Sequence, residues 1–363
     1  MTYALNSALI SMIKIEPFLA TDSTQVRALL RHQDELMPYE AFCAEEKLFH
    51  SGLFFWQHWL PCRYHLAPAI YVAKDNGVIL GLISIVSYGK ANSCWWINHL
   101  VVHPNHRGRG IGQKLMQYVF ALFGSQGVSH FVMEISCQNS AAMSLLGGLG
   151  FRRAARLVHY QMPSDRRMSK TGEKNEENAV FRWAQPEDQN LLYQLFQDSL
   201  PSDLRVVYAY NSDDFVLEAI PADLAPNALK RLYKLKNWYW VAHDMERNVL
   251  TAAIKVSSHR QGDFHIEFVI HPGWQHMAKE AVGYAMQAID RLGMAGMVMT
   301  KVYDYQAGTA EALEQLGWQK HGEFLLMVKE HWLRAKKRSL KLDTTVTIPT
   351  MGKPAINLPF TLE

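Results

Sequence analysis

Apolar positions in the first part of this chain alternate between the spacing of strands and that of helices. The apolar run at 97–102 predicts a strand, and the amphipathic stretch at 113–123 predicts a helix. Residues 132–136 predict a second strand, and the stretch that opens at Asn139 predicts a second helix. Strands that alternate with helices in this way indicate an α/β fold.

Four patterns recur in the second part of the chain, in the same order and at a nearly constant offset. This recurrence indicates a tandem duplication of one fold. The paired segments are 12–30 with 180–196, the hairpin pattern 70–84 with 239–254, Val101-Val-His-Pro with Val269-Ile-His-Pro, and Leu149-Gly-Phe with Leu316-Gly-Trp.

Length and local composition agree with two domains. The chain has 363 residues, of which 48% are hydrophobic and 20% are charged, as in an ordinary globular protein. The segment between the two copies is too polar to bury a core of its own. We therefore expect an N-terminal extension at 1–11, a first domain at 12–163, a polar linker at 164–179, a degenerate second domain at 180–333 and a C-terminal tail at 334–363.

Glycines and arginines cluster directly after the strand at 97–102. Glycines allow backbone amides to approach an anion, and the following helix adds about half a positive charge at its N-terminus. The arginines can add charge-assisted hydrogen bonds. The spacing Arg-x-x-Gly-x-Gly is neither a Rossmann fingerprint nor a Walker loop. We call this predicted anion site the cradle; it consists of Arg107, Gly108, Arg109, Gly110, Ile111 and Gly112.

The cradle resembles the signature of the GCN5-related N-acetyltransferase (GNAT) superfamily, and Asn139-Ser-Ala-Ala with Gly150-Phe151 looks like the second motif of that family. The resemblance implies two tandem acyl-CoA N-acyltransferase folds with mixed α/β sheets, packed as an internal pseudo-dimer. It also implies acetyl-CoA as the acyl donor, without a metal. In such a site the cradle would hold the pyrophosphate, the backbone of Leu100, Val101 and Val102 would bond the pantetheine arm, and Asn139 would bond the cofactor.

The second half lacks these features. Gln275 to Glu280 replaces the cradle, with side chains in place of both motif glycines and a carboxylate that would repel a pyrophosphate. Gln306 stands in the position of Asn139, and Lys301 stands in the position of Glu134. We therefore predict one acetyl-CoA site per chain, in the first half, and a structural or acceptor-binding role for the second half.

Glu134 is the candidate general base. It matches, by position, the glutamate that acts as base in the branch of the family that acetylates ribosomal-protein N-termini. A carboxylate in an apolar cleft can accept a proton through water, whereas the alternative is a salt-bridged or edge glutamate. Leu146 occupies the position where the family usually has a tyrosine that protonates the leaving thiolate. The resemblance therefore implies slower transfer, or a substitute such as Tyr160 or a water.

The function that these features predict is transfer of an acetyl group to a primary amine of an unidentified small molecule or peptide, by direct attack in a ternary complex. The alternative is a weakly active or inactive acetyl-CoA-binding regulatory or assembly protein. The aromatic insertion at 31–68 could line the acceptor side, form a core helix pair or contact a partner or membrane surface.

Composition limits the kinds of partner that the sequence predicts and indicates a cellular compartment. A net charge of +3 without a dominant basic run does not indicate a nucleic-acid partner. No apolar run approaches the ~18 residues of a membrane span. The four cysteines, Cys43, Cys62, Cys94 and Cys137, lack metal-type spacing, which favours reduced thiols in the cytoplasm. We expect a monomer.

Overall fold

The elements of the first half follow the predicted pattern. The computed structural model describes residues 13–31, 69–88, 93–125, 127–162, 180–208, 210–215, 217, 237–260, 263–292 and 296–331. In chain order the first half contains β1 (Lys14–Pro17), η1 (Ala20–Asp22), α2 (Ser23–Leu30), β2 (Ala69–Asp75), β3 (Val78–Tyr88), β4 (Cys94–Val102), η4 (Pro104–His106), α5 (Ile111–Gly124), β5 (His130–Ser136), α6 (Ser140–Gly148) and β6 (Arg152–Gln161).

The second half repeats this order. It contains β7 (Phe181–Trp183), η6 (Pro186–Asp188), α7 (Gln189–Ser199), α8 (Ser202–Tyr208), η7 (Ser212–Asp214), β8 (Asn237–Asp244), β9 (Val249–Arg260), β10 (Asp263–Ile270), η8 (Pro272–Met277), α10 (Ala278–Leu292), β11 (Val298–Tyr303), α11 (Ala307–Gln315) and β12 (Gln319–Glu330). The predicted extension 1–11, linker 164–179 and tail 334–363, and the aromatic insertion from residue 32 on, lie outside the described residues.

One β-sheet runs through both halves. The strand order is β1-β2-β3-β4-β5-β12-β6-β11-β10-β9-β8-β7, and neighbours are antiparallel except β4 with β5 and β10 with β11. This mixed sheet, mostly antiparallel and accompanied by helices, is the predicted fold class. Because the sheet is continuous, the domain limits 12–163 and 180–333 stay a prediction from the sequence repeat.

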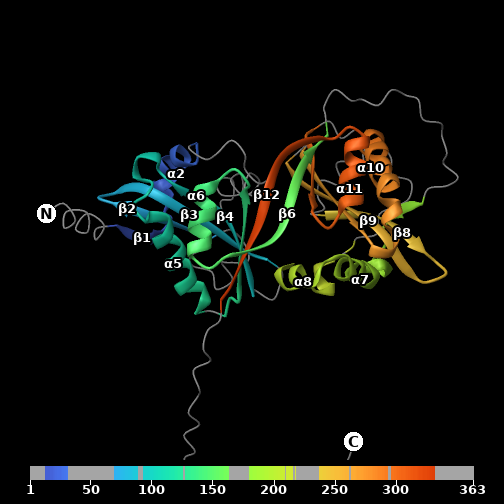
Figure 1. Cartoon of the computed structure of the whole chain (residues 1–363), viewed down its shortest axis with the longest axis horizontal. Coiled ribbons are helices and arrows are strands. Elements are labelled where there is room, and N and C mark those ends of the chain that lie inside the picture. The colour runs from blue at the N-terminus through green and yellow to red at the C-terminus, as the bar shows by residue number, and fades with distance from the viewer. Residues whose placement is uncertain are drawn as a thin grey trace, which may run out of the picture. The chain divides into compact units, whose positions relative to one another are not determined.

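The last strand of each half pairs with the other half. β12 forms antiparallel pairs with β5 on one edge and with β6 on the other, and β6 pairs antiparallel with β11. Figure 1 shows β12 and β6 side by side where the two halves meet. Phe324, Leu326 and Val328 of β12 are fully buried, and each such side chain contributes roughly 1.5–3 kcal/mol.

Helices cover the sheet of the first half on both faces. The apolar side of α5 packs against strand residues such as Trp95 and Ile97, because its apolar positions recur at helical spacing. The opposite face of the same strands packs against Val26 and Leu29 of α2. The strand and helix that flank the cradle are therefore held by two separate apolar clusters.

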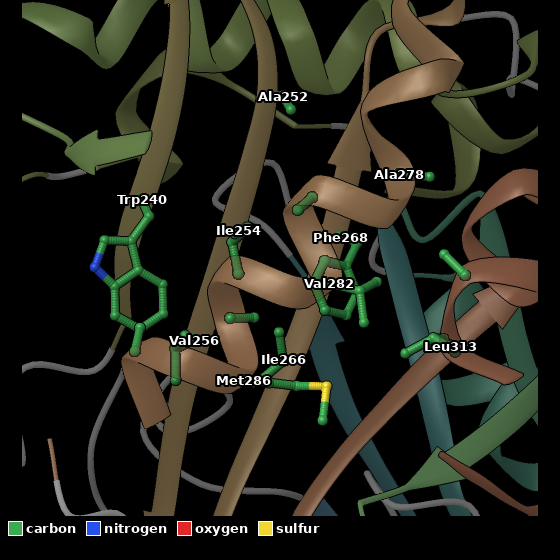
Figure 2. Close-up of a cluster of buried hydrophobic side chains, with 14 of the residues drawn as sticks. Trp240, Ala252, Ile254, Val256, Ile266, Phe268, Ala278, Val282, Met286 and Leu313 are labelled. Atoms are coloured by element: carbon green, nitrogen blue, oxygen red, sulfur yellow. The ribbon is translucent and has the colours of Figure 1, made fainter. Parts of the chain in front are cut away.

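The second half builds its core around α10. The apolar face of this helix packs on β8, β9 and β10, and α11 adds Leu313 (Figure 2). The side chains labelled in Figure 2 are Trp240, Ala252, Ile254, Val256, Ile266, Phe268, Ala278, Val282, Met286 and Leu313.

The end of β12 contacts two helices of the first half. Lys329 Nζ donates to the carbonyl oxygen of Leu149, at the C-terminus of α6, at 2.7 Å. The backbone N–H of His331 donates to Ser129 at 2.7 Å, and its ring lies against Phe120 of α5 and Phe131 of β5. The first half is therefore completed by the final residues of the second half's last strand.

Strand exchange predicts that the halves stay together without a covalent link. If a protease site replaces residues 170–174 and is cut, the two fragments should elute as one species from a sizing column in buffer. They should separate only in denaturant, because β12 must leave its pairs with β5 and β6. Two fragment peaks in buffer would contradict the exchange.

Cys94 gives the structure a defined dependence on alkaline pH. Its side chain is buried beside Trp96 in the cluster covered by α8, and burial raises the pKa of the thiol to about 12. A folded-state pKa above the ordinary value contributes stability that is present below the ordinary pKa and lost as the pH rises through the folded one. From about pH 8 to about pH 10.5, the parent should lose more free energy of unfolding than Cys94→Ala, as measured by urea titration. Equal losses would show that the thiol is not protected.

Candidate active site

The two central strands of the first half part from each other beside the cradle. β4 and β5 pair only through Cys94, Trp95 and Trp96 with residues 130–132, and the pairing register ends there. Beyond this point β4 continues to pair with β3 on its other edge. Among the described residues, the stretch 97–102 therefore presents to β5 a strand edge that β5 does not pair with.

A β-bulge at Asn98 changes which side chains of β4 face α5. His99 pairs with Ser84, whereas Ile97 pairs with Ile85, so Asn98 is the extra residue. Before the bulge Trp95 and Ile97 face the α5 cluster; after it Leu100 and Val102 do. Val101 faces the α2 cluster, and His99 is fully buried, as expected for a core histidine.

The cradle joins the end of β4 to α5 with two left-handed turns. Gly108 and Gly110 each have φ near +74°, a conformation that side chains rarely adopt, and a Cβ at either position would meet no atom within 4 Å. Gly110 is the N-cap of α5 without a side-chain cap, and the first turn contains no acidic residue. The amide groups of this helix start are thus exposed to a ligand without a competing carboxylate.

The cradle arginines and the neighbouring histidines are held close to the turn. Arg107 Nε donates to the carbonyl of Val102 at 3.3 Å, and Arg109 Nη1 lies 3.5 Å from His106 Nδ1. Gly112 allows close packing, since a Cβ there would lie 3.3 Å from Leu145 of α6. The sequence-predicted residues Leu100, Val102 and 107–112 therefore do come together. Within this group, the carbonyl oxygen of Val102 accepts the hydrogen bond from Arg107 and is not available to a ligand in the same way.

Asn139 caps the helix that follows β5. Its side-chain oxygen accepts a hydrogen bond from the N–H of Ala142 at 2.9 Å, which fixes the start of α6. This role accounts for an asparagine at the strand–helix junction. Its predicted contact with the cofactor stays a prediction.

Glu134 lies on β5 in a buried environment and contacts a histidine. Its residue is 7% exposed, and Oε1 lies 2.6 Å from Nε2 of His159 on β6, itself 1% exposed. This distance is short enough for an ion pair, which requires a protonated His159, and neither carboxylate oxygen has an aligned hydrogen-bond partner within the described structure. Both oxygens therefore keep acceptor capacity for a proton. The salt-bridged alternative weighed for this glutamate is present, with a histidine as its partner.

The missing acid at Leu146 is not replaced by Tyr160. Leu146 is 1% exposed in the core under α5. The hydroxyl of Tyr160 donates to Glu314 of α11 at 2.8 Å, and burial together with this bond raises the pKa of Tyr160 above its ordinary value. Adjacent residues on β6 face opposite sides, so His159 faces Glu134 and Tyr160 faces the core of the second half. The suggestion that Tyr160 substitutes for the acid was therefore wrong.

In the second half the equivalent strands, β10 and β11, also separate, but the side chain of Gln306 bridges them. β10 and β11 pair only through residues 264–266 and 298–300. Gln306 Nε2 donates to the carbonyl of Phe268 on β10 at 3.0 Å, and its Oε1 accepts from the N–H of Tyr303 at 3.0 Å. At the equivalent position in the first half, Asn139, shorter by one methylene, accepts from the N–H of Ala142 in its own helix.

The repeated His-Pro motifs have the same structural role. His103 Nδ1 accepts from the N–H of Asn105, and His271 Nδ1 accepts from the N–H of Gly273, each capping a short 3-10 helix. After the second motif, Ala278 starts α10 without a positive-φ glycine before it. The two halves therefore share the turn but not the cradle.

Residues 29–151, which contain β4, the cradle, β5 and α6, match the acetyltransferase (GNAT) family. This chain carries a GNAT domain. The GCN5-related N-acetyltransferase of Sphaerobacter thermophilus shares its fold, with a TM-score of 0.55 at 12% identity over 89% of this chain and 97% of that one. A tandem GNAT protein from the clavulanic acid biosynthesis pathway does so with a TM-score of 0.52 at 13% identity, covering 89% and 100%.

Curated relatives match only part of this chain. The L-amino acid N-acyltransferase MnaT of Escherichia coli is 32% identical over 110 residues, which are 29% of this chain and 59% of that protein. N-alpha-acetyltransferase 30 of Schizosaccharomyces pombe is 36% identical over 94 residues, 25% of this chain and 63% of that protein. The chain thus spans less than two thirds of the length of either relative.

The described residues contain neither a metal-type cluster nor a helix fit to cross a bilayer. They contain no group of three or more His, Cys, Asp or Glu side chains arranged to hold a metal ion. None of the described helices combines the length and the apolar character that a bilayer crossing requires.

Sequence reasoning missed the partner of Glu134. His159 carries no motif, and its approach to β5 depends on the exchange of β12 and β6, which the sequence repeat does not reveal. The only available signal was a lone histidine inside an apolar strand of the GNAT half.

Proposed function

We propose that this chain is an N-acetyltransferase that transfers an acetyl group from acetyl-CoA to a primary amine in a ternary complex. The observation that carries the proposal is the separation of β4 from β5 directly beside an uncapped helix start with two positive-φ glycines. The match of residues 29–151 to the GNAT family and the similarity of part of the chain to named acyltransferases support it.

The described residues fit acetyl-CoA at one place in the chain. The open space at Gly108 and Gly110 suits close approach of a pyrophosphate to backbone amides, and Arg107 and Arg109 add positive charge. Among the described residues, the edge of β4 at Leu100 to Val102 is not paired with β5 and suits the pantetheine arm, although the carbonyl of Val102 accepts from Arg107. Bound acetyl-CoA would supply a thioester carbonyl for acylation of the amine, with release of the CoA thiol.

Glu134 would remove the proton that keeps the acceptor amine unreactive. Lysine side chains have a pKa near 10.4 and N-terminal amines one near 7.7–8.0, so a base matters most for lysine-like acceptors at neutral pH. The carboxylate has two acceptor oxygens without hydrogen bonds in the described structure, and it lies on the strand that borders the separation. Both features suit proton acceptance, directly or through one water.

The relatives support an acceptor that presents an α-amino group. One is named as an L-amino acid N-acyltransferase, another as an L-methionine sulfoximine/L-methionine sulfone acetyltransferase, and others as N-alpha-acetyltransferases. Free amino acids and peptide N-termini share the amine on the α-carbon. A panel of free L-amino acids and short peptides is therefore the first set of acceptors to assay.

A second candidate function is acetyl-CoA binding without turnover, in a regulatory or assembly protein. The burial of Leu146, where a proton donor would be expected, favours it. Acetyl-CoA consumption separates the two candidates, since only the enzyme releases CoA thiol in the presence of the amine panel, whereas both bind acetyl-CoA.

Acetyl-CoA should bind once per chain and should depend on the cradle. Gly110→Glu is expected to weaken acetyl-CoA binding about a hundredfold or more, because the new carboxylate would occupy the space for the pyrophosphate and repel its charge. Isothermal titration calorimetry measures both the affinity and the number of sites.

Gly77→Glu is the matched control for this variant. Gly77 also has a positive φ, +80°, and open space for a Cβ, but it lies in the β2–β3 hairpin. The control carries the same charge and similar backbone strain, and it should bind acetyl-CoA like the parent. Two equivalent sites, or normal affinity in Gly110→Glu, would overturn the one-site proposal.

Glu134→Gln should lower turnover about a hundredfold at neutral pH while leaving acetyl-CoA affinity near that of the parent. The amide keeps the size of the side chain but cannot take a proton. Glu323→Gln, at an exposed position on β12 beside Arg156, is the control and should keep parent turnover. Parent turnover in Glu134→Gln would assign the base to another group.

A further inference from the structure

Three buried polar side chains form a line across the exchanged strands. Glu134 on β5 contacts His159 on β6, with 2.6 Å between Oε1 and Nε2. His159 stands directly opposite Lys301 of β11 in the antiparallel register, which brings side chains of one face within about 5 Å at Cβ. Lys301 is 9% exposed. His159 thus has a carboxylate in contact on one side and, on the neighbouring strand, a lysine directly opposite in register.

Lys301 reaches the point at which β4 and β5 part. Its ammonium lies 5.5 Å from the centre of the Trp96 ring. Trp96 is the last residue of β4 that pairs with β5. The Trp96 ring also packs against Tyr208 of α8, whose hydroxyl is hydrogen-bonded to that of Tyr303 on β11. The second half therefore places a cation and two aromatic side chains at the start of the separation in the first half.

The carboxylate of Glu134 and the ammonium of Lys301 occupy equivalent positions in the two halves. Glu134 and Lys301 each lie fifteen residues before the Leu-Gly-aromatic turn of their own half, so they occupy equivalent positions. Strand exchange brings the fifth strands of the two halves to either side of the β12–β6 pair. The equivalent positions of the two halves therefore carry opposite charges, and strand exchange places them near each other.

Burying such groups is costly unless they are paired, and apolar replacements of buried ion pairs are often neutral or stabilising. A contribution to stability therefore explains poorly why three titratable side chains are buried near one another here. A carboxylate that must be held in one orientation gives a stronger reason.

We propose that His159 and Lys301 are positioning residues for Glu134, and that the second half takes part in the reaction through Lys301. His159 holds the carboxylate by direct contact. Lys301 supplies a positive charge on the strand next to His159, and its ammonium lies over the ring of Trp96. This inference rests on the proposed function, in which Glu134 accepts the proton of the amine.

The experiment uses the full chain and compares single and double variants. Lys301→Met removes the charge, Lys301→Arg keeps it, and His159→Gln removes the imidazole. Lys255→Met is the matched control, because Lys255 is also a second-half lysine that pairs with a glutamate, Glu267, and lies over an aromatic ring, that of Phe196. Turnover is measured with the best acceptor of the amine panel, and acetyl-CoA affinity is measured by calorimetry.

The expected result is a fall in turnover of about tenfold in Lys301→Met and His159→Gln, with acetyl-CoA affinity unchanged. Lys301→Arg should regain most of the activity, and Lys255→Met should match the parent. In a Glu134→Gln background neither change should lower turnover further, since a residue that acts only through Glu134 has nothing left to position. Without any ligand, urea midpoints of the Glu134 and Lys301 variants should be non-additive.

Three outcomes would overturn the inference, and they can be told apart. If Glu134→Gln is inactive but Lys301→Met and His159→Gln keep parent turnover, the base stands and the positioning role falls. If Lys301→Met lowers turnover equally with and without Glu134, Lys301 has only a structural role. If Glu134→Gln keeps parent turnover, the proposed base fails and the positioning role falls with it. Should Lys301→Met not fold, Lys301→Arg and His159→Gln make the same comparison.

Discussion

The antiparallel pairing of β12 with β5 is the interaction on which the rest of the structure depends. It fills the edge that β5 would otherwise expose, places β6 beside β11, and brings Lys329 and His331 against the helices that carry the cradle. An unpaired strand edge is costly and prone to aggregation, so neither half has a complete sheet without the other. The duplicated halves are thereby one folding unit, although only one of them keeps the GNAT cradle.

Local features of the fold could be predicted because each has a local cause. The glycines and arginines of the cradle, the asparagine that caps α6 and the Asn76-Gly77 hairpin turn all determine backbone geometry within a few residues. The sequence repeat likewise predicted two similar halves. Neither pattern specifies which strand lies next to which, because β5 can pair equally well in principle with a strand of its own half. Strand exchange was therefore beyond local reasoning.

The candidate site likewise combines features that the sequence could predict with features that depend on long-range strand pairing. Leu100, Val102 and the cradle lie near one another because they are close in sequence, and their contact with acetyl-CoA stays a prediction. The bulge at Asn98, which turns Leu100 and Val102 rather than Val101 toward α5, has no signature in a continuous apolar run. The neighbours of Glu134 were missed, and Tyr160 was misassigned, because both depend on which half β6 joins. A long-range pairing decides the chemistry around a residue that a local motif had identified.

The position of β12 after all the other described strands also affects the order of events during synthesis. The ribosome completes β4, the cradle and β5 long before it reaches β12, so the edge of β5 has no native partner while the second half is being made. Contacts of such long sequence separation form late and slowly. The nascent first half must therefore remain soluble with an open strand edge. Emergence of β12 from the ribosome, rather than completion of the GNAT segment, is the event that makes the native sheet possible.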